Sequence, residues 1–186
     1  MDAKERFREI VPKYDKEIVK IIPCYKQMIE ALINIIPFNN CENINILDLG
    51  CGTGSLTQKI KEKFPNSHIT CMDLSKEMIN LAKKKLYDYD YVKFINADFT
   101  DFNFNNDFYD VVLSSLAIHN LVWDEDKKNL YRRVYKALKK DGLFYIGDFV
   151  SASSRFNQRL YDHVINNFVR ENLMEEERLK YSVKTT

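Results

Sequence analysis

Three alternating glycines in the segment LDLGCGTG, residues 47–54, form the motif with the clearest chemical meaning. Glycine lets the backbone adopt positive φ and lets a ligand approach it closely. The segment leaves an apolar run and enters a helical pattern, and open α/β sheets bind ligands where such a loop follows a strand. We therefore expect a ligand site here, with contacts from Gly50, Cys51, Gly52 and Gly54.

The spacing of this loop distinguishes two classes of ligand. Dinucleotide sites use G-x-G-x-x-G, whereas this loop is G-x-G-x-G and has Asp48 two residues before its first glycine. A carboxylate at that position would not stabilise a negatively charged pyrophosphate, but it would attract a positively charged ligand. S-adenosylmethionine (SAM) carries a sulfonium and an amino group, so the loop favours SAM as the cofactor. The alternative is that Asp48 only accepts hydrogen bonds from loop N–H groups.

Two further acids follow apolar segments. Asp73 ends the segment HITCMD, where a carboxylate can accept both ribose hydroxyls. A helix that begins just beyond would equally favour an acid at its N-terminus. Asp98 and Phe99 follow a third apolar segment, and there Asp98 could accept from an adenine amino group while Phe99 or the backbone packs the ring. The alternative is that Asp98 only forms a turn.

Methyl transfer from a sulfonium needs alignment more than it needs a catalytic group, because the electrophile is already activated. Two candidates lie just past apolar segments. His119 is the best base, since histidine titrates near neutrality, and it is also a candidate for binding the substrate. Asp148 could be catalytic or bind substrate. The alternatives are that His119 packs the loop before Trp123 and that Asp148 only ends its strand.

The elements that must position these residues follow from the hydrophobic pattern. Helical periodicity predicts two N-terminal helices, over 5–21 and 24–36. Beyond them, the expected strands are 45–49, 68–73, 91–95, 110–115 and 143–150, and the expected helices are 55–64, 76–87, 124–140 and 155–173. This alternation predicts an α/β fold with a parallel sheet and helices on both faces.

Composition excludes several classes of protein. The chain has 186 residues, 45% hydrophobic and 30% charged, which suits one domain and is unlike a disordered chain. A net charge of +1 gives no support for binding nucleic acid through bulk charge. The four cysteines form no C-x-x-C pair and no zinc-ligand spacing, so we expect free thiols, no metal site and a cytoplasmic location. No apolar stretch has membrane-spanning length.

Five motifs in order resemble those of the class I SAM-dependent methyltransferases, over roughly residues 7–150. LDLGCGTG resembles their first motif, CMDLSKEMI their ribose-binding segment and NADF their adenine-binding segment. DVVLSSLAIHNL and LKKDGLFYIGDF resemble the fourth-strand and fifth-strand motifs. The resemblance implies a three-layer Rossmann-like sheet in the parallel order 3-2-1-4-5. The further cofactor contacts that we expect are Leu74, Met78, Ser114 and Ser115.

The N-terminal segment VPKYDKEIVKIIPCY resembles a subgroup of small-molecule methyltransferases that includes the carboxy-SAM enzymes of tRNA wobble-uridine modification. This implies that Tyr25 contacts the cofactor and that Tyr14 belongs to a lid over the substrate. The alternative is two core tyrosines. The expected domains are a helical lid segment over 1–40, a SAM-binding core over 41–150, and a C-terminal helix and tail over 151–186.

The sequence departs from the resemblance at its C-terminal end. Methyltransferases of this class usually have seven strands, and strands six and seven are not found in the sequence. The chain is thus expected to be either a fragment or a naturally shortened member. The fifth strand, LFYIGDFV, would lie at a sheet edge, where an apolar strand invites pairing. We therefore expect self-association, as a homo-oligomer, or lower stability than a version extended past Thr186.

These observations together predict an enzyme, a SAM-dependent methyltransferase that acts on a small molecule by in-line displacement. The sequence lacks the [DN]-P-P-[YFW] segment of methyltransferases that modify exocyclic amines of nucleic acids. Two alternatives stay open. One is a tRNA-modification enzyme using SAM or carboxy-SAM, which would need a carboxylate-binding arginine near the cofactor. The other is a SAM-binding protein or fragment without turnover.

Overall fold

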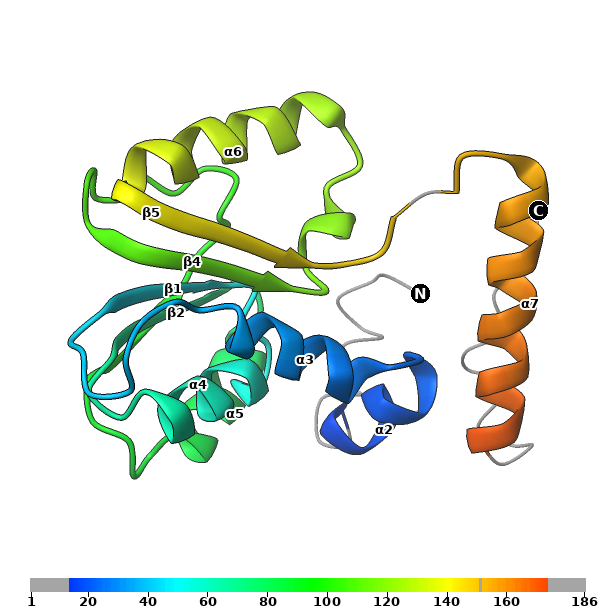
Figure 1. The fold of residues 1–186 in the computed structure, drawn as a ribbon, viewed down its shortest axis with the longest axis horizontal. Helices are drawn as coiled ribbons and strands as arrows, with labels where there is room; N and C mark the ends of the chain where they lie inside the picture. Colours follow the sequence, from blue (N-terminus) through cyan, green and yellow to red (C-terminus); the bar gives the residue numbers. More distant parts are fainter. Residues whose placement is uncertain (1–13, 151, 174–186) are drawn as a thin grey trace. The chain divides into compact units, whose positions relative to one another are not determined.

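The computed structural model describes residues 14–150 and 152–173 of the chain. These residues divide into two compact units (Figure 1). One unit comprises residues 29–148. The other unit is formed by the described residues that precede residue 29 and follow residue 148 in the sequence.

A five-stranded sheet forms the middle of the larger unit. Its strands are β1 (Asn45–Leu49), β2 (His68–Asp73), β3 (Val92–Asn96), β4 (Tyr109–Ser115) and β5 (Leu138–Gly147). They run in the order β3-β2-β1-β4-β5, and every pair is parallel. The expected α/β fold and the order 3-2-1-4-5 are therefore confirmed. The winding reverses between β1 and β4, so the loops after these two strands share one edge of the sheet.

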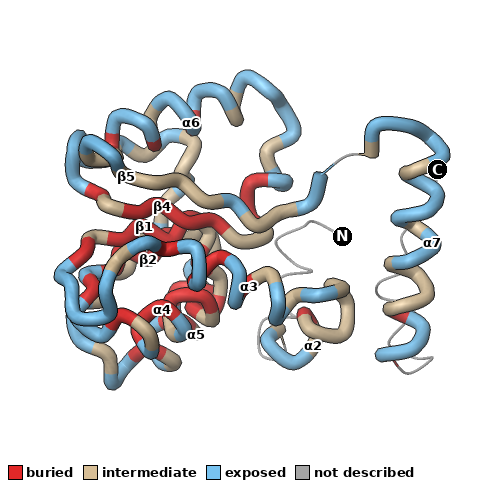
Figure 2. The backbone as a smooth tube through the Cα atoms, in the orientation of Figure 1, coloured by how far each residue is buried: buried red, intermediate tan, exposed pale blue. Residues whose placement is uncertain are grey.

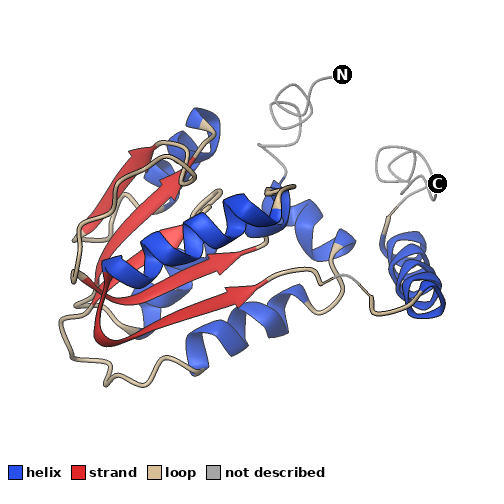
Figure 3. Cartoon of the chain, turned by 90° about the horizontal axis from the view of Figure 1, so that it is seen from above, coloured by secondary structure: helices blue, strands red, loops and turns tan. Residues whose placement is uncertain are grey.

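Helices cover both faces of this sheet. Figure 1 shows α4 (Ser55–Lys63) and α5 (Lys76–Lys85) on one face and α6 (Asp124–Ala137) on the other. Figure 3 shows the sheet from above with helices on both of its sides. Part of α3 (Tyr25–Asn34) also belongs to this unit, and a short 3-10 helix, η2 (Ile118–Asn120), follows β4.

The core of the unit lies against the central strands, which carry continuous apolar runs as strands buried on both faces do. Leu47 and Val112 are fully buried and pack with Leu130, Val134 and Ala137 of α6. Figure 2 shows this burial along β1 and β4. Phe64, at the end of α4, is also fully buried. The sheet therefore holds the loops at its carboxyl edge on a rigid base.

Local sequence signals set several helix boundaries. Ser75 caps α5 as expected, because its hydroxyl accepts a hydrogen bond from the Met78 N–H at 3.2 Å. The α4 helix begins at Ser55, as predicted. Gly54, with φ of +81°, is its N-cap and Ser55 is its first helical residue. The α4 helix ends before Phe64, and Pro65 follows.

The boundary between α6 and β5 differs most from the prediction. The helix was expected to continue to Lys140, but it ends at Ala137, and β5 begins at Leu138. The reason is tertiary, because the N–H groups of Asp107 and Phe108 donate to the last carbonyls of α6 and bring the chain beside β4. The expected strand 143–150 is therefore shifted, and Asp148 comes directly after β5 rather than within it.

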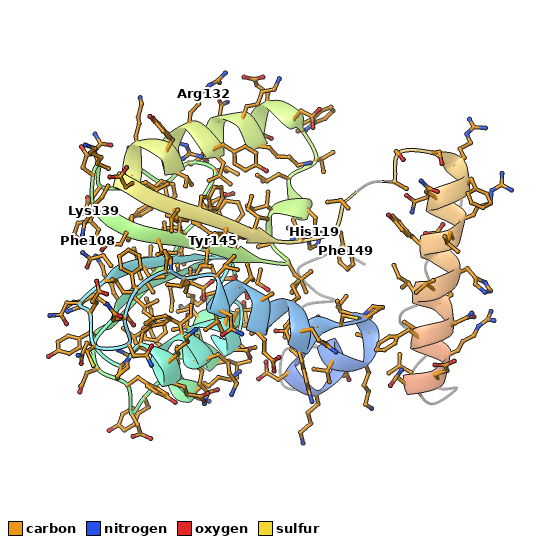
Figure 4. The ribbon with its side chains drawn as sticks, in the orientation of Figure 1. Phe108, His119, Arg132, Lys139, Tyr145 and Phe149 are labelled. Atoms are coloured by element: carbon orange, nitrogen blue, oxygen red, sulfur yellow. The ribbon has the colours of Figure 1, made fainter. Side chains whose placement is uncertain are left out.

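The β5 strand lies at the edge of the sheet. Among the described residues, β4 is the strand that pairs with it, and no strand follows β5 in the part of the chain that the structure describes. Tyr145 is a residue of β5 (Figure 4), and its hydroxyl donates a hydrogen bond to the Ile35 carbonyl at 3.1 Å. On β5, Ile146 stays 40% exposed.

The smaller unit contains α2 (Tyr14–Ile21) and α7 (Arg155–Asn172), which pack against each other. Ser154 caps α7 by accepting from the Asn157 N–H at 3.2 Å. The expected helix over 5–21 is seen only from Tyr14 onward, and its earlier residues lie outside the described range. No helix in residues 14–150 and 152–173 is both long enough and apolar enough to cross a membrane.

Candidate ligand-binding site

The glycine loop follows β1 and has a positive φ at each of its three glycines. Gly50 is required by packing, because a Cβ there would lie 2.3 Å from the Cβ of Ala117. Gly52 is different. A Cβ at Gly52, where φ is +54°, would meet no atom within 4 Å. The loop is therefore pressed against the chain after β4 at one glycine and faces open space at the next.

The β2 strand holds the loop in this shape. The N–H groups of Gly50 and Cys51 both donate to the Met72 carbonyl, at 2.8 and 2.9 Å. The Gly52 N–H donates to Oδ2 of Asp73 at 2.9 Å. Because these bonds fix consecutive N–H groups, the loop is organised by its neighbours before any ligand arrives.

Asp73 connects the glycine loop to the start of α5. Besides its bond to Gly52, it accepts the Ser75 N–H on Oδ1 at 2.8 Å. Burial raises the pKa of Asp73, and the two backbone hydrogen bonds oppose that rise. The helix-start role that the sequence left open is thus present. A carboxylate oxygen has more than one lone pair, so the predicted ribose contact is compatible with these bonds and stays a prediction.

Asp48 is a buried acid beneath the loop. Its Oδ2 accepts the Thr57 hydroxyl at 2.6 Å, whereas its buried Oδ1 has no hydrogen-bond partner among the described residues. Loss of hydration on burial raises the pKa of Asp48 to about 7, the Thr57 bond opposes this, and the charge of Asp73 adds to it. The described donor to Asp48 is therefore a hydroxyl and not a loop N–H group.

Thr57 is a residue that the sequence analysis missed. It is fully buried on α4, and its hydroxyl also lies 3.2 Å from the Cys71 sulfur. A small polar residue within the buried face of a helix is the signal that could have found it. Cys51 is buried as well, and its contact with Cys71 together with burial raises the pKa of its thiol. The Cys51 thiol is therefore a neutral packing group under the loop.

The segment expected to bind adenine lies beyond β3. Oδ1 of Asp98 accepts from the N–H and the hydroxyl of Thr100, at 2.7 and 2.6 Å, which is the turn that the sequence left as an alternative. Phe99 packs against the core, and its ring reaches within 3.9 Å of a Cβ placed at Gly50. Arg133 of α6 donates to the Phe99 carbonyl at 2.9 Å. Phe99 is therefore held beside the glycine loop, and the adenine roles stay predictions.

His119 and Asp148, which the sequence named separately, contact each other. Nδ1 of His119 lies 2.6 Å from Oδ1 of Asp148, and the His119 N–H donates to Oδ2 at 3.0 Å. The Asp148 side chain is 8% exposed and that of His119 is 36% exposed. His119 lies beside the carboxyl end of β5 (Figure 4). A buried carboxylate thus orients a partly exposed imidazole.

The remaining predicted contacts occupy varied environments. Ser114 is buried, and its hydroxyl donates to the Leu49 carbonyl at 2.9 Å, which ties β4 to β1. Met78 is buried on α5, Leu74 is largely exposed, and Ser115 pairs with Gly147 of β5. Tyr14 and Tyr25 belong to the smaller unit. The ligand contacts expected of these residues stay predictions.

Comparison with known proteins places this site in a family. A family model described as a methyltransferase domain matches residues 46–142, more than half of the chain. A malonyl-[acyl-carrier protein] O-methyltransferase of Priestia megaterium is 33% identical over 86% of this chain and 56% of its own length. A carboxy-S-adenosyl-L-methionine synthase of Staphylococcus epidermidis is 29% identical over 83% of this chain and 69% of its own length.

A solved structure agrees with these relatives. The S-adenosylmethionine-dependent methyltransferase of Mesorhizobium loti is 30% identical, with a TM-score of 0.50, over 59% of this chain and 47% of that chain. The chain spans about half the length of the first malonyl-[acyl-carrier protein] relatives.

Proposed function

This chain belongs to the family of SAM-dependent methyltransferase domains, and we propose that its glycine loop binds SAM for methyl transfer to a small molecule. The observation that carries the proposal is Asp48, whose buried Oδ1 is unpartnered among the described residues. It lies beneath a loop that opens into unfilled space at Gly52. A positively charged ligand near the loop would favour the ionised carboxylate, and attraction between charges is strong where water is excluded.

The residues at the loop fit SAM in three ways. Asp48 supplies a negative charge for a sulfonium or an ammonium group. Asp73, already oriented by its bonds to Gly52 and Ser75, can accept ribose hydroxyls on its remaining lone pairs. Phe99, held beside Gly50, offers an aromatic face for adenine. We place Asp98, Leu74, Met78, Ser114 and Ser115 at the same ligand. The roles that the family resemblance implies for Tyr25 and Tyr14 stay predictions.

Bound SAM supplies an activated methyl group, so the chain has to align the acceptor and exclude water. The rigid base for this alignment is the carboxyl edge of β1 and β4. Ser114 ties these two strands together, and Ala117 packs against Gly50. We place the acceptor at this edge, near His119 and Asp148.

Calorimetry tests the choice of ligand. We expect SAM and S-adenosylhomocysteine (SAH) to bind and NAD and NADP not to bind, because the loop spacing and Asp48 disfavour a pyrophosphate. Binding of NAD with no heat from SAM would overturn the proposal. A second assay follows SAH release with malonyl-acyl carrier protein and a metabolite panel. SAH binding with no turnover by any acceptor would favour a SAM-binding protein without activity.

The names of the relatives do not favour the tRNA-modification alternative. They refer to a malonyl-acyl carrier protein and to the synthesis of carboxy-SAM, and the net charge of +1 offers no bulk attraction for nucleic acid. We also infer a cytoplasmic location. It is supported by the four cysteines, which are free thiols in the described residues.

A further inference from the structure

We propose that His119 and Asp148 form a general-base pair, so that this chain methylates a protic acceptor, an O–H or N–H group, rather than a carboxylate. The inference deepens the proposed function and rests on it. It concerns the acceptor side of the site, whereas the glycine loop concerns the cofactor side.

Asp148 holds His119 at two points. One carboxylate oxygen accepts the backbone N–H of His119 at 3.0 Å, and the other lies 2.6 Å from Nδ1 of the ring. Capping the short helix η2 would need only the first bond. The second bond fixes the direction of the imidazole, which is what a positioned base requires.

The contact also sets the chemistry of the imidazole. An ionised carboxylate only accepts hydrogen bonds, so the short contact assigns the proton to Nδ1 and leaves the lone pair of the neutral ring on Nε2. The same carboxylate would stabilise the imidazolium that forms when Nε2 takes up a proton. Asp148 is largely buried and His119 is partly exposed, so the pair combines a buried carboxylate with a partly exposed imidazole.

The fold brings this pair to the glycine loop. Leu116 follows β4 with φ of +51°, an uncommon conformation for leucine, and its N–H donates to the Gly147 carbonyl at 2.8 Å. The next residue, Ala117, occupies the space beside Gly50. His119 lies two residues further on and Asp148 directly after Gly147, so the base and the loop share one edge of the sheet.

The step balances without any further reactant. As the acceptor atom forms its bond to the methyl carbon, the bond from that carbon to sulfur breaks and its electron pair stays on sulfur. His119 takes the acceptor's proton on Nε2, and the imidazolium later gives that proton to water. A carboxylate acceptor is already ionised at neutral pH and has no proton to give. An oriented base would serve no purpose for it.

The test compares acceptors and variants by SAH release from the full chain. The protic acceptors are a panel of phenols, enols and primary amines, and the carboxylate acceptors are malonate and malonyl-acyl carrier protein. We expect turnover of a protic acceptor, with kcat lowered about 100-fold or more in His119→Gln and in Asp148→Asn.

Two controls separate this inference from the proposed function. His119→Gln should bind SAH in calorimetry as the wild type does. If the wild type did not bind SAH, the proposed function and the general-base pair would both be overturned. His68→Gln changes a histidine that stacks on Tyr91 at the start of β2, and it should leave the rate unchanged. Turnover of carboxylates alone, full activity of His119→Gln, or SAH binding with no protic acceptor methylated would overturn the general-base pair.

Discussion

Replacing Asp48 by asparagine should make the stability of the ligand-free protein less dependent on pH. Burial raises the pKa of Asp48 from 3.8 to about 7. An acid whose pKa is raised on folding costs stability when it ionises. The folded protein therefore loses stability as pH rises from the unfolded value through the folded one. At 1.36 kcal/mol per pKa unit, the full loss above pH 7 is about 4 kcal/mol.

The size of the effect can be worked out for two practical conditions. Proton linkage predicts that about half of this loss of stability, roughly 2 kcal/mol, occurs between pH 5.5 and pH 8. Asp48→Asn removes the charge at both values, although its amide hydrogens cost about 1–3 kcal/mol where they find no acceptor. That cost is independent of pH. The difference in unfolding free energy between variant and wild type should therefore shift by about 2 kcal/mol in favour of the variant at pH 8.

Urea unfolding at pH 5.5 and pH 8 measures this shift. Asp88→Asn serves as the matched control, since Asp88 is exposed and its replacement should give the same change at both pH values. Parallel pH dependences for wild type and Asp48→Asn would show that folding does not raise the pKa of Asp48. The electrostatic reasoning for the ligand site would then fail with it.

Three further predictions concern the loop and the sheet edge. Asp73→Ala should weaken SAH binding at least tenfold in calorimetry, because about 1.5–3 kcal/mol per charged hydrogen bond is lost, and an unchanged affinity would leave Asp73 as a helix-start residue only. Gly52→Val should abolish SAH binding while a thermal melt still shows a folded protein. The valine side chain would enter the open space at this position and strain a φ of +54°. Retained binding would mean that the ligand lies elsewhere. The edge position of β5 predicts concentration-dependent self-association in size-exclusion chromatography. A monodisperse, stable monomer at 186 residues would contradict this.

The sequence by itself determined the features that depend on neighbouring residues. The β1 and β2 strands begin and end where the apolar runs 45–49 and 68–73 predicted, because a short run between polar segments fixes both ends of a buried strand. The Ser75 cap and the glycine loop follow from local chemistry in the same way. The sheet order followed from the order of the motifs, which resemble a known family.

Tertiary structure alone decided the features that join distant segments. The α6 helix ends three residues early because Asp107 and Phe108, far from it in sequence, bind its last carbonyls. Asp48 has Thr57 as its donor because α4 packs on β1, and no pattern within either segment states that pairing. His119 and Asp148 meet because β4 and β5 pair in a register that places Ser115 opposite Gly147. Periodicity describes one segment at a time, whereas side-chain contacts depend on how two segments are aligned, and that alignment exists only in the folded protein.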